Sequence, residues 1–480
     1  MEFSSFPKNL AYAVKSLSGF SKSTVKLLPD NRTDTVTSGN IVRVRLPQNS
    51  LVDLRTFTMY YEGSCSNDKT TCKAHFPRLS SSIIETLTIF VNGTQIENIQ
   101  NYNLLYNTLY DLDGGGIDQQ AKRHLENVDP SVYYEVGTNS ATTGGALNTL
   151  LHDTSNKYDS ASDAKNRKFI INNWLGFLST CSTPVIDTND LNECIVELRL
   201  SNADILFLSG QDGVTTTEGN ATSFTLSKVG FTISKIVFND PMYYNMKASK
   251  LLGDGLTLGY NTYINTRSGQ TKKATSMNVY TNINTTSLNQ VICVLQNPYN
   301  WGTGSGTAKH LLLNNAASGT DEDRVPFQSA LADALPVTGV IGDLFNQSSY
   351  FRRNGVGLTT SQLFINNTPI MSQPLEPHLI YNENLIALGN NHTDMGIGIH
   401  PGCVSLAHFL KYYFCHIVSL ENICAGEPFY KTGLDGKASS LNINSVSSFT
   451  TAVDEVIPHI YCNCTRIMQI NEGHAITIIV

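Results

Sequence analysis

The chain has 480 residues, of which 41% are hydrophobic and only 15% are charged, and its formal net charge at pH 7 is −7. A chain of this length exceeds what one hydrophobic core usually supports, so we expect two or three domains. The acidic balance argues against a protein that coats nucleic acid, and no run of about 18 apolar residues predicts a membrane-spanning helix.

The first 39 residues differ in composition from the rest and predict an N-terminal arm. They contain five basic and three acidic residues, a net charge of +2, with serine, glycine and proline between them. The spacing of Leu10, Val14 and Leu17, with Phe20 one turn on, fits a short amphipathic helix against a partner. A flexible tail is the alternative interpretation. The arm lacks the apolar run of a secretory signal.

The next segment, residues 40–112, predicts strands followed by a helix. Apolar and polar residues alternate over 41–46, 51–61 and 83–93, as on half-buried strands. Asn92-Gly93 favours a tight hairpin turn. Leucines at helical spacing predict a helix over 101–112, and the loop-rich stretch 113–165 reads as an insertion.

Strand patterns return after this insertion and continue to the end of the chain. We expect strands at 168–178 and 193–208, a polar linker at 209–223, and a second half that starts with a strand at 224–238 and a helix at 241–255. Further strands are predicted at 256–266, 274–283, 287–296, 403–420, 457–471 and 475–480, with a second insertion at 300–356.

A short motif occurs once in each half. Phe90-Val91-Asn92-Gly93-Thr94-Gln95-Ile96 resembles Phe364-Ile365-Asn366-Asn367-Thr368-Pro369-Ile370, and the copies are followed by LLYNTLYDL (104–112) and LIYNENLIAL (379–388). A spacing of 364 − 90 = 274 residues is too long for a solenoid or propeller repeat, so it indicates two domains of one type.

Many short strands and few helices in two equivalent halves predict an all-β fold. We expect two tandem eight-stranded antiparallel jelly rolls, with short helices and long loop insertions. The expected division is an arm at 1–39, a first jelly roll at 40–222 and a second at 223–480.

Two stretches resemble ligand-binding loops, but in each of them a required residue is missing from its position. Asp111 and Gly116 suit a calcium-binding loop, but its twelfth position is Lys122 instead of glutamate. The glycine-rich stretch 301–309 places Lys309 three residues too late for a phosphate-binding loop.

The cysteines and histidines predict no metal site. Ten cysteines follow no disulfide framework, so we expect reduced, mostly buried thiols. Cys462 and Cys464 should share one face of a strand, and no second half-site accompanies them or the pair Cys65 and Cys72. For the histidines at 400, 408 and 416, a role in the core or in a loop is a better interpretation than metal binding. With no Gly-x-Ser-x-Gly or His-Glu-x-x-His motif, we expect no catalytic, cofactor-binding or metal-binding residues and no enzyme.

Five stretches resemble the double jelly-roll major capsid proteins of double-stranded DNA viruses, closest to those of polinton-like viruses and virophages. They are GNIVRVRLPQNSLVDLRTFTMYY (39–61), LTIFVNGTQIENI (87–99), NNWLGFL (172–178), Ile186 to Leu200, and FTISKIVF (231–238) running into the helix at 242–252.

The resemblance implies a structural protein of the virion. It implies homotrimeric, pseudo-hexameric capsomers that tile an icosahedral capsid assembled inside the host cell, with penton and minor or cement proteins as further partners and no specific nucleic-acid binding. The arm would lie on the inner side and touch an internal membrane, a cement protein or a neighbouring capsomer.

Two other functions stay open at this point. A secreted or surface β-sandwich that binds glycans, such as a spike or adhesin, would carry disulfides and exposed aromatic residues. A cupin-like enzyme would use a jelly-roll barrel with a cluster of metal-binding histidines.

Overall fold

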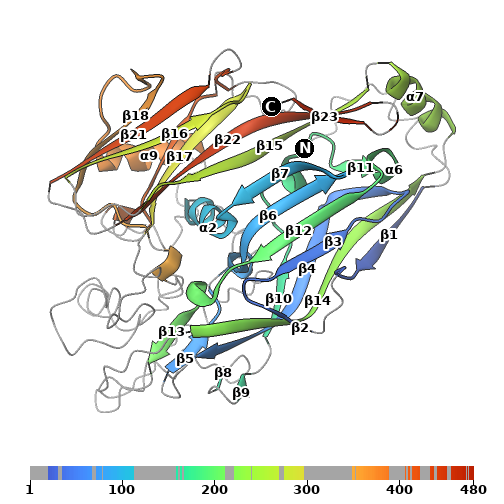
Figure 1. Cartoon of the computed structure of the whole chain (residues 1–480), viewed down its shortest axis with the longest axis horizontal. Coiled ribbons are helices and arrows are strands. Elements are labelled where there is room, and N and C mark those ends of the chain that lie inside the picture. Colours follow the sequence, from blue (N-terminus) through green and yellow to red (C-terminus); the bar gives the residue numbers. More distant parts are fainter. Residues whose placement is uncertain are drawn as a thin grey trace, which may run out of the picture.

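The computed structural model shows a protein built almost entirely from antiparallel strands in two halves that lie side by side (Figure 1). It describes residues 20–30, 35–67, 72–77, 79–112, 158–159, 163–164, 167–210, 221–238, 241–253, 255–269, 275–296, 349–351, 353–388, 406, 409–410, 413–421, 433–436, 440–450, 456–471, 473 and 475–479.

The first half contains two sheets that enclose a hydrophobic core. One sheet has the order β1-β14-β4-β10, with β2 and β11 paired at its margins, and the other has the order β3-β12-β6-β7. The strands of the first sheet are β1 (Phe20–Leu27), β2 (Thr35–Thr37), β4 (Leu51–Asn67), β10 (Arg167–Ile171), β11 (Val185–Asp187) and β14 (Ala221–Phe238). Those of the second are β3 (Ile41–Arg45), β6 (Ile84–Val91), β7 (Thr94–Gln100) and β12 (Cys194–Leu200).

The second half repeats this arrangement. Its sheets have the orders β15-β22-β17-β20, with β23 paired to β22, and β16-β21-β18-β19. The strands are β15 (Leu256–Arg267), β16 (Ser276–Ile283), β17 (Leu288–Gln296), β18 (Leu358–Ile365), β19 (Thr368–Pro369), β20 (Cys415–Ser419), β21 (Leu441–Phe449), β22 (Ile457–Ile470) and β23 (Ile476–Ile479).

The two halves share one topology. If the eight main strands of each half are counted along the chain, both halves have the sheet orders 1-8-3-6 and 2-7-4-5. Helix α2 (Tyr102–Leu112) follows the fifth strand of the first half, and α9 (Pro377–Ala387) follows the fifth strand of the second. This is the arrangement of a jelly roll, and it confirms the predicted fold class.

The repeated motif lies at equivalent hairpins in the two halves. Asn92 and Gly93 connect β6 to β7 with φ angles of 48° and 76°, and Asn366 and Asn367 connect β18 to β19 with φ angles of 51° and 63°. Two consecutive positive φ angles are those of a type I′ turn, which favours asparagine and glycine. The repeat is therefore a shared turn that joins the fourth and fifth strands.

The boundaries of the two halves along the sequence differ from those expected. Strand β14 was expected to open the second half, but it pairs with β1, β2 and β4 of the first half. Likewise β1 and β2, which lie within the expected arm of residues 1–39, belong to the first sheet. The reason is that a jelly roll places its last strand beside its first, a pairing that local alternation of residues does not reveal. Residues 1–19 lie outside the described part of the chain.

Further differences occur where a strand is interrupted. The expected strand 168–178 ends at Ile171, because Gly176 adopts a φ of 78° and is followed by the short helix α5 (Phe177–Thr180). The expected strand 193–208 breaks between β12 and β13 (Phe207–Gly210). Of the expected strand 403–420, the structure describes β20 as a strand. Strand β21 was not expected, since serines occupy part of its buried face.

The remaining elements are short or lie at the margins. They are β5 (Cys72–His75), β8 (Tyr158–Asp159), β9 (Asp163–Ala164), α6 (Thr188–Leu191) and α7 (Pro241–Leu252), with single 3₁₀ turns at Ser80–Ile83, Ala203–Ile205 and Ser349–Phe351. Helix α7 connects the last strand of the first half to the first strand of the second.

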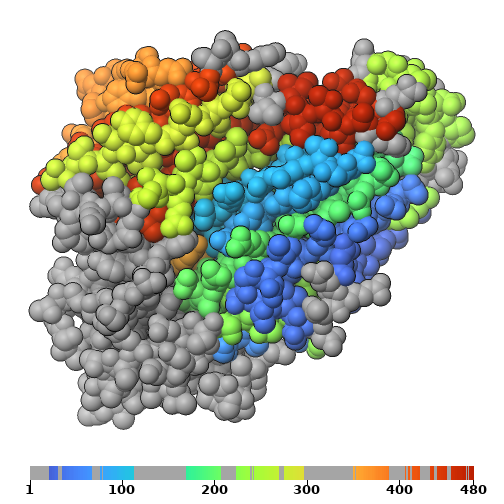
Figure 2. Space-filling model, in the orientation of Figure 1, coloured from blue at the N-terminus to red at the C-terminus, as the bar shows by residue number. Residues whose placement is uncertain are grey.

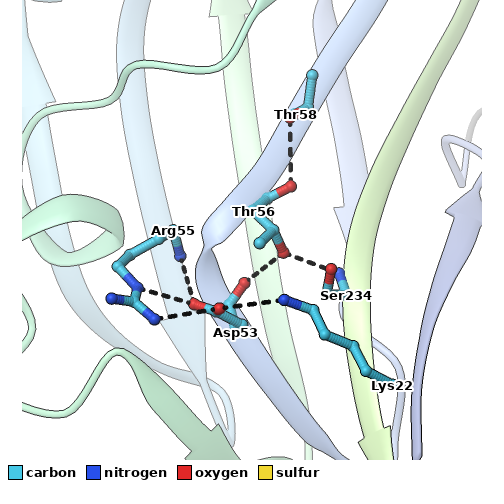
Figure 3. A network of polar contacts seen from close by, with 6 residues as sticks. All are labelled: Lys22, Asp53, Arg55, Thr56, Thr58 and Ser234. Atoms are coloured by element: carbon cyan, nitrogen blue, oxygen red, sulfur yellow. Dashed lines mark hydrogen bonds and ion pairs between the residues drawn. The ribbon is translucent and has the colours of Figure 1, made fainter.

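A polar network fixes the point where β4 changes its partner from β11 to β10 (Figure 3). The carboxylate of Asp53 accepts hydrogen bonds from the guanidinium of Arg55 at 3.1 and 3.3 Å and lies 3.9 Å from the ammonium of Lys22 in β1. The Thr56 hydroxyl donates to the Asp53 carbonyl and accepts from the backbone N–H of Ser234 in β14. The network thereby ties three neighbouring strands together at the irregularity.

Candidate functional site

The two halves meet along a junction that is held by hydrogen bonds. Strand β7 of the first half lies against β15 of the second, and Tyr461 of β22 reaches the residue before α2 (Figures 1 and 2). Side chains of the second half donate to backbone carbonyls of the first: Tyr260 and Arg466 to Ile96 at 2.8 and 3.3 Å, Asn265 to Gln100 at 3.2 Å, and Tyr461 to Asn101 at 3.1 Å. These bonds give the junction a defined register.

Helix α2 is the centre of this junction. Every residue of α2 except Leu109 is buried, and the rings of Tyr102, Tyr106 and Tyr110 stack one turn apart, with centroids separated by 6.0 and 6.3 Å. Residues four apart share one face of a helix, so the tyrosines form a continuous apolar ridge. A helix buried on nearly all sides indicates that the two halves form one packed unit.

A fully buried ion pair crosses the junction. Asp111 in α2 and Arg353 of the second half have no exposed side-chain surface, and Oδ2 of Asp111 lies 2.5 Å from Nη2 of Arg353. The arginine also donates to the carbonyl of Phe351 and lies over the ring of Tyr413. Asp111 was the first ligand of the rejected calcium loop, and its carboxylate is engaged by arginine. Residues 113–122 of that loop lie outside the described residues.

A second acidic residue, Glu97 in β7, is buried beside the junction. Its Oε2 accepts a hydrogen bond from the backbone N–H of Phe177 at 2.9 Å. Burial raises the pKa of Glu97 to about 8, because transfer from water disfavours the charged form. The carboxyl group occupies the space over Gly176, where an added Cβ would lie 2.1 Å from Oε1. Glu97 therefore fills a cradle that only glycine provides.

Two histidines of the second half, His416 and His459, belong to its core, whereas His378 in α9 is exposed. His416 bonds Ser361 through Nδ1 at 2.9 Å, and His459 bonds Gln296 through Nε2 at 3.0 Å. Burial lowers the pKa of His416 to about 4 and that of His459 to about 3. The core role expected for His416 is confirmed, whereas His400 and His408 lie outside the described residues.

The described thiols also lie mainly in the interior. Cys462 and Cys464 are both buried in β22, as expected, and burial raises the pKa of both thiols. Cys181, Cys194, Cys293, Cys415, Cys462 and Cys464 are free thiols, and all of them except Cys181 are buried. Among the described residues, no group of three or more potential ligands is placed to hold a metal ion. The stretch 301–309 is not among the described residues.

A cavity of about 430 Å³ separates α7 from β11, α6 and β15. Three of its four charged lining residues are paired with one another: Nζ of Lys247 lies 2.5 Å from Asp187 and 3.0 Å from Asp190, and Lys250 is the fourth. This cluster joins the connecting helix to the first half. No helix in the described residues is long and apolar enough to cross a membrane.

Two surfaces remain exposed although their counterparts are buried. Helix α9 exposes Leu379 and Ile386 at 45% and 43%, whereas the equivalent α2 is buried. Strand β1 forms an outer edge with most of its residues exposed, whereas the equivalent β15 is covered by β7. Sequence analysis did not identify the junction, Glu97 or the α9 surface. The one available signal was Asp111, a charged residue at the end of an apolar helix pattern.

Comparison with solved structures finds the same fold in virus capsid proteins. The PBCV-1 virus capsid is 10% identical, with 96% of this chain and 97% of that chain covered and a TM-score of 0.56. The Sputnik virophage structure is 11% identical, with 96% and 89% covered and a TM-score of 0.52, and the Faustovirus major capsid protein is 10% identical, with 94% and 91% covered and a TM-score of 0.50.

No family model matches the chain, and no curated protein matches it. The likeness to solved structures is one of fold, and it extends over nearly the whole chain. It confirms the expected double jelly roll.

Proposed function

We propose that the chain is a structural protein, the major capsid protein of a double-stranded DNA virus, and that it acts in the virion without catalysis. The observation that carries this proposal is the duplicated topology: the described residues form two jelly rolls of identical strand order, and the likeness in fold to capsid proteins extends over 96% and 94% of the chain.

The duplicated domain explains how the chain could build a capsid. Three copies of a chain with two similar halves present six similar domains around one axis, and such a pseudo-hexamer can tile a flat facet. The proposed unit is therefore a homotrimer that associates further into an icosahedral capsid. Obligate interfaces of this kind bury more than roughly 2,000 Å².

The N-terminal residues and α7 support a contact on the inner side of the capsid. Phe20, the first residue of β1, pairs with Phe238, three residues before α7 begins. The described part of the chain therefore begins near α7, which exposes Met246 and Leu252 at 63% and 70%. We assign this end to an internal membrane, a minor or cement protein or a neighbouring capsomer, and we place the penton protein among the further partners.

The mass of the purified chain in solution tests the proposal. Three copies of the 52.6 kDa chain give a species of about 158 kDa, and electron microscopy of concentrated protein should show pseudo-hexagonal particles or sheets. A chain that stays monomeric at all concentrations and forms no sheets or shells would contradict the proposal.

A further inference from the structure

The contact between the two halves has an unoccupied counterpart in each half. Within the chain, the fifth strand of the first half, β7, packs on the first strand of the second half, β15, and the following helix α2 lines a cavity together with Tyr263 of β15. The second half has the same fifth strand and helix, β19 and α9, and the first half has the same outer first strand, β1.

Both counterparts carry the apolar surface of an interface. Around α9, Leu379, Ile386 and Ile370 are 45%, 43% and 38% exposed. At the end of β1, Leu28 is 55% exposed. In the part of the chain that the structure describes, β1 pairs with one strand only, β14, so its other edge offers backbone groups to a partner.

The two surfaces cannot meet within one molecule. Helix α9 and strand β1 lie on opposite flanks of the chain, with the internal junction between them (Figure 1). A contact between them therefore needs a second copy and joins the copies head to tail, which produces a closed ring if the rotation between them closes.

Their charges are complementary. The β1 segment 20–28 contains Lys22 and Lys26 and no acidic residue, whereas the α9 segment 376–388 contains Glu376 and Glu383 and no lysine or arginine. Within α9, Nδ1 of His378 lies 3.5 Å from the Glu376 carboxylate. Lys26 is exposed, and the side chains of Lys22 and Glu376 are 49% and 62% exposed. Lys22 and Arg55 share the carboxylate of Asp53, so these three side chains together keep one net positive charge (Figure 3). Opposite charges on two surfaces favour and orient their encounter.

We infer that α9 of one copy packs on the β1 edge of the next copy, with Glu376 and Glu383 facing Lys22 and Lys26. This inference rests on the proposed function and specifies its contact between copies. Strand β19 has only two residues, whereas β7 has seven. We therefore expect α9 to supply a larger share of the contact between copies than α2 supplies of the contact within the chain.

Charge reversal tests the pairing. The variants K22E/K26E and E376K/E383K place like charges in the contact, and each should raise the concentration at which the trimer dissociates at least tenfold. Combining all four substitutions in one chain restores opposite charges at every contact and should return the dissociation concentration toward that of the wild type. Sedimentation at 50 mM salt measures the mass, and circular dichroism checks that each variant is folded. The control K228E reverses an exposed lysine on β14 that belongs to neither surface.

The outcomes separate the inference from the proposed function. A wild-type trimer whose dissociation is unchanged by either two-residue variant, or is not restored by the combined variant, overturns this contact and leaves the capsid role standing. A wild-type chain that never associates overturns both.

Discussion

Asp111 and Arg353 lie 242 positions apart in the chain, yet their side chains form an ion pair of 2.5 Å with no exposed surface. One belongs to the helix after the fifth strand of the first jelly roll, and the other lies in the second jelly roll, so the pair joins the two halves in the protein interior. A buried ion pair adds little net stability compared with apolar packing, but removal of one partner leaves an uncompensated charge.

Asp111→Asn should therefore destabilise the protein by about 3–5 kcal/mol, because Arg353 stays buried without its counter-ion. Urea unfolding measures the loss. The control is Lys228→Ala, which breaks the exposed pair with Glu62 and should cost less than about 1 kcal/mol. The double variant D111L/R353M should recover most of the loss. Equal losses for D111N and K228A would contradict the assignment of the pair as the buried junction.

The raised pKa of Glu97 predicts a loss of stability as pH rises. The folded state retains a proton up to about pH 8, whereas the unfolded state loses it near pH 4.5, so the free energy of unfolding falls between these values and then levels off. The slope is at most about 1.4 kcal/mol per pH unit. Glu97→Gln keeps an acceptor for the N–H of Phe177 and should abolish this contribution between pH 6.5 and 8. An unchanged slope in E97Q would show that Glu97 does not titrate in this range.

Gly176→Ala should destabilise the protein more than Gly93→Ala. Both glycines have positive φ angles, 78° and 76°, so both substitutions strain the backbone, by about 1–3 kcal/mol each. Only at Gly176 does the new Cβ meet another group, the Glu97 carboxyl group at 2.1 Å, whereas nothing lies within 4 Å at Gly93. Thermal unfolding of both variants measures the difference, and equal losses would mean that Glu97 moves aside without cost.

The sequence predicted the features that depend on neighbouring residues. The Asn92-Gly93 turn, the helix 102–112 and the alternating strands 41–45 and 51–61 follow from local backbone preferences and from burial of one sheet face. The repeat then predicted two similar domains, and the resemblance predicted their closure into jelly rolls.

Features that depend on distant pairing were not predictable. Strand β14 alternates equally well for either half, and only its pairing with β1 and β4 assigns it to the first. The exposed faces of β1 and α9 likewise look like ordinary surface until the equivalent β15 and α2 are seen to be covered. The candidate interface thus becomes visible only by comparison of the two halves in three dimensions.

Burial of His416 predicts that acid weakens the second jelly roll. Its pKa falls from 6.5 to about 4 on folding, so below pH 6.5 the unfolded state binds a proton that the folded state excludes, and the free energy of unfolding falls with decreasing pH until about pH 4. The loss reaches about 1.4 kcal/mol per pH unit.

His416→Asn removes this titration, since an asparagine amide can occupy the Nδ1 position that contacts Ser361. The variant should be less stable at pH 7, because the smaller side chain leaves unfilled space, but its stability should decline less steeply between pH 6.5 and 4.5. Unfolding of both proteins at matched pH values isolates the contribution of His416, because all other titrating groups, including Glu97 and His459, are common to the two. Parallel curves for the variant and the wild type would mean that His416 titrates normally and that the interior of the second half admits water.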